Sequence, residues 1–149
     1  MNPGRTAARK EESSMAGKEF LGCGLKFPLQ IDPRTGKIAL SRQEEDIAEA
    51  IGIILHTSMG ERVMHPEFGT NAQEYAFSAL SHSEKASIAY EISEQLLLQE
   101  PRIVDVSAQC GEADGAAGKL AVEVSYTVRS TNNRYNRVYP FYLTEGAEE

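Results

Sequence analysis

The chain has 149 residues, a formal net charge of −7 and two cysteines. This length suits one domain with its own core, and the negative charge argues against a protein that follows a nucleic-acid backbone, where Lys and Arg must replace counterions. No apolar run approaches the ~20 residues of a membrane span, and the N-terminus lacks the apolar centre of a signal peptide. We therefore expect a soluble cytosolic protein in which Cys23 and Cys110 are reduced thiols.

The chain begins with a polar segment. Residues 1–19 are small, polar or charged and have almost nothing to bury, so we expect a flexible arm unless a partner orders it. Residues 24–40 predict two short extended pieces around a turn at residues 32–36, where a proline suits an early turn position and a glycine supplies a positive φ. This segment is either an entry hairpin or an extended arm.

A first main helix should follow. Ser41 and Glu44 have the spacing of a capping box, in which each side chain accepts a bond from an unpaired amide of the first turn. Gly60 is placed to end the helix in the left-handed conformation. One face carries a helical stripe that we interpret as core, formed by Ile47, Ile51, Ile54, Leu55 and Ser58.

Two further helices are expected. Asn71 and Glu74 repeat the capping pattern and start a short helix through Leu80. Ser81 and Glu84 start the second main helix, which should run to about Gln99 because a proline follows two residues later. Its expected buried face is made of Ile88, Ala89, Ile92, Leu96 and Leu97.

The hydrophobic period then changes to two, which predicts half-buried strands. Pro140 confines a third strand, residues 137–143, to a sheet edge or a bulge, and the small residues 111–118 form an exposed loop. The fold class is therefore α+β: an extended N-terminal segment, two main helices with a short helix between them, then a three-stranded antiparallel sheet. The apolar positions of the first two strands are Val104, Val106, Ala108 and Cys110, then Leu120, Val122, Val124, Tyr126 and Val128.

The segment GERVMHPEFG, which we call the junction loop, combines two acids, an arginine, a histidine, a proline and two glycines. Glu61 and Glu67 are the obvious pair for glycoside hydrolysis, which needs two carboxyl groups about 5 to 9 Å apart, yet the cationic groups nearby should lower both pKa values instead of raising one. The histidines and cysteines lack the tight spacing of zinc ligands. We expect no catalytic residue, metal or cofactor. The residues of interest are Gly60, Glu61, Arg62, His65, Pro66, Glu67, Phe68 and Gly69.

The same loop can act as a rigid junction between proteins. Its two glycines allow sharp turns and its proline stiffens the path. Arg62 offers a planar fork to carboxylates or helix C-termini. We expect Val63 and Phe68 to anchor the loop to the core.

Several blocks of the chain together resemble the baseplate wedge and sheath-initiator family of contractile phage tails, type VI secretion baseplates and extracellular contractile injection particles. The blocks are LKFPLQID with TGKIAL, ILHTSMGERVMHPEFG, Glu-Pro-Arg at residues 100–102, and YTVRSTNN with YPFYL. The resemblance covers nearly all of residues 20–144, which we take as one domain, followed by an acidic tail at residues 145–149.

This resemblance implies a structural subunit, present in six copies, that joins the baseplate wedge and templates the first sheath ring. Its implied partners are wedge proteins, sheath subunits and inner tube or hub proteins, with assembly in the bacterial cytoplasm and then a place in the particle. Some members carry a tail lysozyme label, which leaves peptidoglycan hydrolysis as the alternative.

The resemblance also assigns residues to roles. Glu100, Pro101 and Arg102 match the family's wedge-assembly signature; Pro101 fixes the helix end and places the two charges beside a bend, ready for charge-assisted bonds unless both are simply solvated. The junction loop would face the wedge. Strands donated by sheath subunits would add to the sheet, whose docking strands would be formed or backed by Val122, Val124, Tyr126, Val128, Tyr139 and Phe141.

Overall fold

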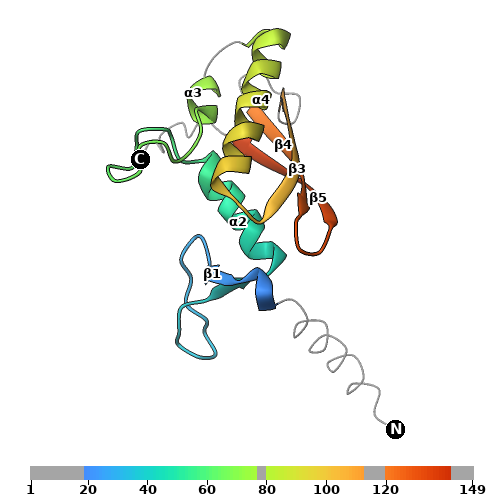
Figure 1. Cartoon of the computed structure of the whole chain (residues 1–149). Coiled ribbons are helices and arrows are strands. Elements are labelled where there is room, and N and C mark those ends of the chain that lie inside the picture. Colours follow the sequence, from blue (N-terminus) through green and yellow to red (C-terminus); the bar gives the residue numbers. More distant parts are fainter. Residues whose placement is uncertain (1–18, 77–79, 113–119, 142–149) are drawn as a thin grey trace. The chain divides into compact units, whose positions relative to one another are not determined.

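The computed structural model describes residues 19–76, 80–112 and 120–141. The predicted arm up to residue 18, Ala79, most of the loop 111–118 and the acidic tail lie outside these residues. The described elements form the expected α+β fold, with helices on one side of a three-stranded antiparallel sheet and a small two-stranded sheet near the N-terminus (Figure 1). The chain divides into two compact units at Glu49, inside helix α2 (Glu44–Leu55).

The first unit is built on a hairpin, which is one of the two alternatives that the sequence left open. A short 3-10 helix (Glu19–Leu21) precedes strand β1 (Cys23–Leu25), which pairs antiparallel with β2 (Leu40–Arg42). Between the strands, Asp32 accepts bonds from the Arg34 amide at 2.9 Å and the Thr35 hydroxyl at 3.1 Å. These are the local bonds by which an aspartate shapes a turn.

The predicted capping box at Ser41 is wrong. Ser41 lies in β2 opposite Gly24 and is buried, and helix α2 begins three residues later. Gln43, with a φ of 59°, accepts the first helical bond from Ile47 at 3.3 Å. Because Ser41 is paired within a strand, it does not act as the N-cap that its spacing to Glu44 predicts.

The second unit contains the end of α2. Ile51, Ile54 and Leu55 are buried as predicted, and the His56 ring stacks on Phe141 with centroids 4.6 Å apart. The helix ends at Leu55, so the prediction that Gly60 terminates it is wrong. Gly60 does have a positive φ of 81°, but it serves the loop that follows.

The main sheet has the order β3-β4-β5, from strands β3 (Ile103–Glu112), β4 (Leu120–Val128) and β5 (Asn133–Phe141). The central strand β4 supplies most of the sheet's core side chains, with Leu120, Val122, Val124, Tyr126 and Val128 all buried. The other two strands form the edges of the sheet.

Strand β3 departs from the simple alternation that the sequence predicts. Its register with β4 shifts by one residue between Val104 and Ser107, and Asp105 has a φ of 50°. Such a bulge reverses which residues face the core. Ile103 is therefore buried ahead of the bulge, where Val104 was expected.

Helices α3 (Ala72–Tyr75) and α4 (His82–Gln99) complete the second unit. The capping box of Ser81 and Glu84 is confirmed, as is the buried face of α4, except that Leu97 is 45% exposed. Asn71 makes no side-chain cap; its amide instead donates to Glu91 at 3.0 Å.

None of the described helices combines the length and apolar character that crossing a membrane requires.

Candidate functional site

The Glu-Pro-Arg triplet forms a closed ion pair at the end of α4. Glu100 is the C-cap residue, with an extended backbone, and Pro101 prevents the helix from continuing. The Arg102 guanidinium then folds back, and its Nε and Nη2 each donate to one oxygen of the Glu100 carboxylate at 2.7 Å. The Arg102 amide donates to the same carboxylate at 3.1 Å.

Glu100 is only 5% exposed, so the alternative in which both charges are simply solvated is wrong. The two side chains make charge-assisted bonds to each other across the bend. The Arg102 side chain is 30% exposed and its carbonyl accepts a bond from the Arg129 amide at 2.9 Å, which ties the bend to the end of β4. The triplet therefore fixes the α4 to β3 connection, with the Arg102 side chain partly exposed.

The junction loop is held closed by its own main chain. The Gly60 amide donates to the Pro66 carbonyl at 2.7 Å, and Ser58 and Thr70 form an isolated parallel bridge. Gly69 has a φ of 106°, and a Cβ there would lie 2.1 Å from the Thr57 carbonyl oxygen. Only glycine fits this approach.

A glutamine that sequence reasoning missed connects the loop to α4. The Gln99 side chain accepts from the Gly69 amide at 2.8 Å and donates to the Gly69 carbonyl at 3.0 Å. It also donates to Gln95 at 2.8 Å. Because Gln99 immediately precedes Glu100, one helix end holds both the junction loop and the ion pair; no short motif announces such a contact.

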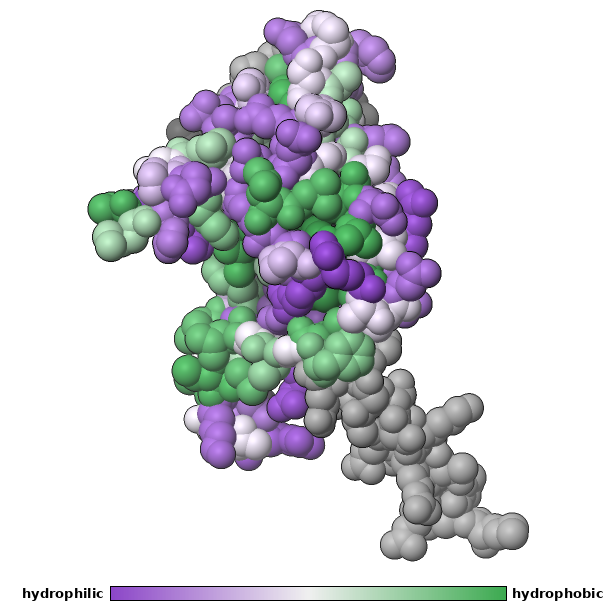
Figure 2. Space-filling view, viewed as in Figure 1, coloured by the Kyte–Doolittle hydropathy of each residue, from purple (hydrophilic) through white to green (hydrophobic). Residues whose placement is uncertain are grey.

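One side chain of the loop departs from expectation. Val63 and Met64 are 94% and 85% exposed, so the prediction that Val63 anchors the loop to the core is wrong. Phe68 is half-buried, and the Arg62 guanidinium lies 4.1 Å above its ring centroid, a cation–π contact within the loop. Figure 2 shows an apolar protrusion where this loop lies.

The two acids of the loop lie in open surroundings. Glu61 is exposed and accepts a bond from the Ser58 amide at 3.0 Å. Glu67 is 76% exposed, with His65 Nδ1 at 3.8 Å from its carboxylate. Neither has the apolar enclosure that a general acid needs. Within the described residues, no group of three or more His, Cys, Asp or Glu side chains is placed to hold a metal.

The predicted docking strands separate into core and edge. The β4 side chains are core, and β4 has a neighbour on both sides, so these residues can only back a docking surface. Tyr139 is half-buried and Phe141 is buried. Strand addition needs unpaired main-chain groups, which leaves the outer edges of β3 and β5.

The edge of β3 is largely covered. Helix α4 lies along this strand (Figure 1), and the Ala108 amide donates to the Ser93 hydroxyl at 3.0 Å. A groove of about 570 Å³ remains between them, with Cys110 at its wall. Burial raises the pKa of the Cys110 thiol above its ordinary value, as expected for an inert core cysteine. The bulge at Asp105 interrupts the edge further.

The edge of β5 is regular and open. The Ala108 amide bonds to Ser93 and so points away from β4, which makes Ala108 and Val124 a non-hydrogen-bonded pair of the β3–β4 ladder. The main-chain groups of Val124 therefore point toward β5, where they bond to Arg137. The amides of residues 134, 136 and 138 therefore point outward, away from β4. Pro140 lies at the next outward position, where its missing amide removes no bond between β4 and β5. Among the described residues, no bond from outside the sheet reaches these amides.

Comparison with known proteins places these features in a family. The model of the family described as baseplate wedge protein gp25 matches residues 41–133. The chain belongs to this family. It is therefore a wedge-type structural component of a baseplate. The matched residues include the junction loop, the Glu-Pro-Arg triplet and the first two strands of the main sheet.

Three solved structures resemble the chain. A candidate tail lysozyme from Geobacter sulfurreducens is 48% identical, with a TM-score of 0.62 over 73% of this chain and 98% of that one. A chain of the anti-feeding prophage baseplate is 22% identical, with a TM-score of 0.56 over 86% and 92%. A chain of the type VI secretion baseplate complex is 14% identical, with a TM-score of 0.52 over 65% and 92%. The last two show the shared fold alone. No curated protein matches the chain.

Proposed function

We propose that this wedge-family subunit joins the baseplate wedge and templates the first sheath ring by accepting a strand at the edge of β5. The observation that carries this proposal is the open edge at residues 134–138 in a sheet whose other edge is bulged and covered by α4. Natural proteins usually block such an edge unless it is used. An added strand would gain main-chain hydrogen bonds from β5, while the buried β4 side chains hold the sheet rigid behind it.

A single substitution tests this edge. Proline at position 138 removes an outward amide and leaves the bonds between β4 and β5 in place. Cells that make Val138→Pro should yield baseplates with bare inner tubes in electron micrographs, whereas Val138→Ala, which keeps the amide, should yield sheathed particles. Sheaths of normal length on Val138→Pro particles would contradict strand addition at β5.

We place the wedge contact at the junction loop and at the C-terminal end of α4. The junction loop is fixed from within and from Gln99, and its exposed apolar tip, Val63 and Met64, suits a partner surface. The Glu100 and Arg102 pair lies at the same helix end. We place wedge proteins there, with six copies per particle, inner tube or hub proteins as neighbours, and assembly in the bacterial cytoplasm before incorporation into the particle.

Deletion of the gene tests the whole assignment. Particles from the deletion strain should lack sheaths or be absent, and wild type should restore them. Rescue by Arg102→Lys, which keeps the charge but loses the two-nitrogen fork, should be weaker than rescue by wild type. Normal sheathed particles in the deletion strain would remove the proposed role.

Peptidoglycan hydrolysis is the second candidate, favoured by the similarity to the Geobacter sulfurreducens protein. We infer that this chain is not an enzyme because Glu61 and Glu67 lie in an exposed loop without an apolar pocket. A suspension of cell walls should stay turbid when the purified protein is added. Clearing that disappears in Glu61→Gln or Glu67→Gln would overturn this inference.

A further inference from the structure

The open edge of β5 is basic in a chain that is acidic overall. Strand β5 contains Arg134 and Arg137 and neither Asp nor Glu, whereas the whole chain has a formal net charge of −7. Both arginine side chains are exposed. Because successive side chains of a strand point to opposite faces, and because these two positions differ by three, the arginines lie on opposite faces of the sheet. A strand added at this edge would therefore meet one guanidinium on each of its faces.

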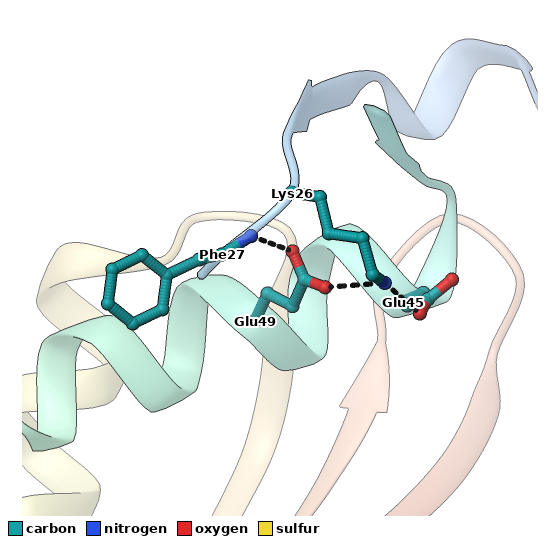
Figure 3. Close-up of polar contacts among 4 residues, drawn as sticks. All are labelled: Lys26, Phe27, Glu45 and Glu49. Atoms are coloured by element: carbon teal, nitrogen blue, oxygen red, sulfur yellow. Dashed lines mark hydrogen bonds and ion pairs between the residues drawn. The ribbon is translucent and has the colours of Figure 1, made fainter. Parts of the chain in front are cut away.

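The two arginines differ from Lys26, a cation that the chain neutralises itself. Lys26 Nζ lies 2.8 Å from Glu45 and 3.1 Å from Glu49, and Figure 3 shows the ammonium between the two carboxylates. Within the part of the chain that the structure describes, Arg134 and Arg137 form no ion pair of this kind. Their charge is therefore not neutralised by any described acid.

The neighbouring strand does not supply the missing acid. Glu123 is the only Asp or Glu of β4, and it lies opposite Val138. Its carboxylate accepts a bond from the side-chain amide of Asn136. Glu123 is therefore used within the sheet, and the guanidinium groups at the edge are left for a partner.

The positions of the edge residues define the sequence that would fit them. The outward amides end at Val138, because Pro140 at the next outward position has none. Residues directly opposite each other in neighbouring strands interact, so acids opposite Arg134 and Arg137 would stand three positions apart in the added strand. Val138 is 61% exposed, which favours an apolar residue opposite it, next to the acid that faces Arg137. This spacing is the same whether the added strand is parallel or antiparallel.

We propose that the strand accepted at β5 is acidic, with two Asp or Glu residues three positions apart and an apolar residue next to one of them. That a strand is accepted at this edge rests on the proposed function. Opposite charges stabilise directly paired positions of neighbouring strands, and like charges destabilise them. A second copy would bring the arginines of both copies to one seam, and charged side chains keep identical edges from pairing. A nucleic acid fits poorly, because two arginines on an acidic chain replace few counterions.

Cross-linking at position 138 identifies the accepted strand. The photoreactive residue p-benzoylphenylalanine replaces Val138, which keeps the outward amide, and purified particles are irradiated and analysed by mass spectrometry. The expected adduct is with a segment of another chain that has the two acids at this spacing. A segment without them, an adduct only with this chain or a second copy of it, or no adduct would overturn the proposal. The same residue in place of Tyr90, a comparably exposed residue of α4, is the control and should not capture that segment.

A matched pair of double variants tests the charge itself. Arg134→Glu combined with Arg137→Glu should lower the cross-linking yield at position 138 by about tenfold, because two attractive pairs become repulsive. Arg134→Lys combined with Arg137→Lys keeps both charges and should change the yield by less than about twofold. Both arginines are exposed, so neither double variant should change the melting temperature. Equal yields from the two double variants would contradict the proposal.

The identity of the captured segment separates this inference from the sheath assignment. A sheath segment without the two acids would leave strand addition in place and remove the acidic pattern. An acidic segment from another baseplate chain would support the pattern and contradict templating of the sheath. The Val138→Pro particles report on sheath formation alone, so the two results can differ.

Discussion

Arg102 closes on Glu100 across Pro101, with Nε and Nη2 each 2.7 Å from a different oxygen of one carboxylate that is only 5% exposed. Arg102→Ala would leave that carboxylate buried without its cation. We expect the free energy of unfolding to fall by about 2 kcal/mol, below the ~3 to 5 kcal/mol of fully buried pairs, because the Arg102 side chain is 30% exposed.

Urea denaturation at neutral pH measures this loss. Adding Glu100→Gln to Arg102→Ala should recover part of it, because a neutral amide is less costly to bury than a carboxylate. If Arg102→Ala alone were as stable as wild type, water would replace the guanidinium at no cost in free energy. The same measurement separates folding defects from assembly defects in particle experiments with Arg102 variants.

Gly69 should be intolerant of any side chain. A Cβ there would meet the Thr57 carbonyl oxygen, and the φ of 106° is unfavourable for other residues. We expect Gly69→Ala to lower the free energy of unfolding by about 3 kcal/mol. Gly60 also has a positive φ, but an added Cβ there would meet nothing within 4 Å. We therefore expect Gly60→Ala to lower the free energy of unfolding by only about 1 kcal/mol.

Gly111→Ala is the control for this series, since its added Cβ meets nothing within 4 Å and its φ lies outside the positive region. Thermal unfolding of the three variants should rank them in that order. Equal effects at Gly69 and Gly60 would mean that the loop moves away from Thr57 at little cost.

The sequence predicted the elements of this fold where the signal was local. The capping box at Ser81 and Glu84 and the buried face of α4 depend on residues three or four apart, and both are confirmed. Ser41 shows where such a rule fails: its hydroxyl had the right spacing to Glu44, but pairing with Gly24 drew it into a strand. A partner seventeen positions away cannot be seen in a local pattern.

The candidate site was less predictable than the fold. The sequence could identify Glu-Pro-Arg as a rigid bend. It could not show that Glu100 is buried or that Glu100 and Arg102 bind each other, because both depend on how the whole helix end packs. Val63 looked like an anchor because apolar residues are usually buried, and it is 94% exposed. The bulge at Asp105, which exchanges the faces of β3, has no glycine or proline to announce it.

The exposed tip of the junction loop should matter for assembly and not for folding. Val63→Ser combined with Met64→Ser removes almost no buried surface, so the melting temperature should stay within ~1 °C of wild type. If the tip contacts the wedge, the amount of this chain in purified particles should fall severalfold. Immunoblots of particles measure this, with Tyr90→Ser as a control at another exposed site. Full incorporation of the double variant would move the wedge contact away from the loop.

Glu84 should make the stability of α4 depend on pH. The Ser81 hydroxyl and amide donate to its carboxylate at 2.6 Å and 2.8 Å, and they hold the pKa of Glu84 below its ordinary value of 4.5. A carboxyl group with a lower pKa in the folded state stabilises that state above its unfolded pKa, and this stabilisation is lost as the pH falls through the folded value. Melting temperatures of wild type and Glu84→Gln should therefore differ most at neutral pH and converge as the pH falls below the ordinary pKa of 4.5. Ser81→Ala, which removes the hydroxyl donor, should also reduce the dependence of the melting temperature on pH. Parallel curves for wild type and Glu84→Gln would show that the capping box contributes no proton-linked stability.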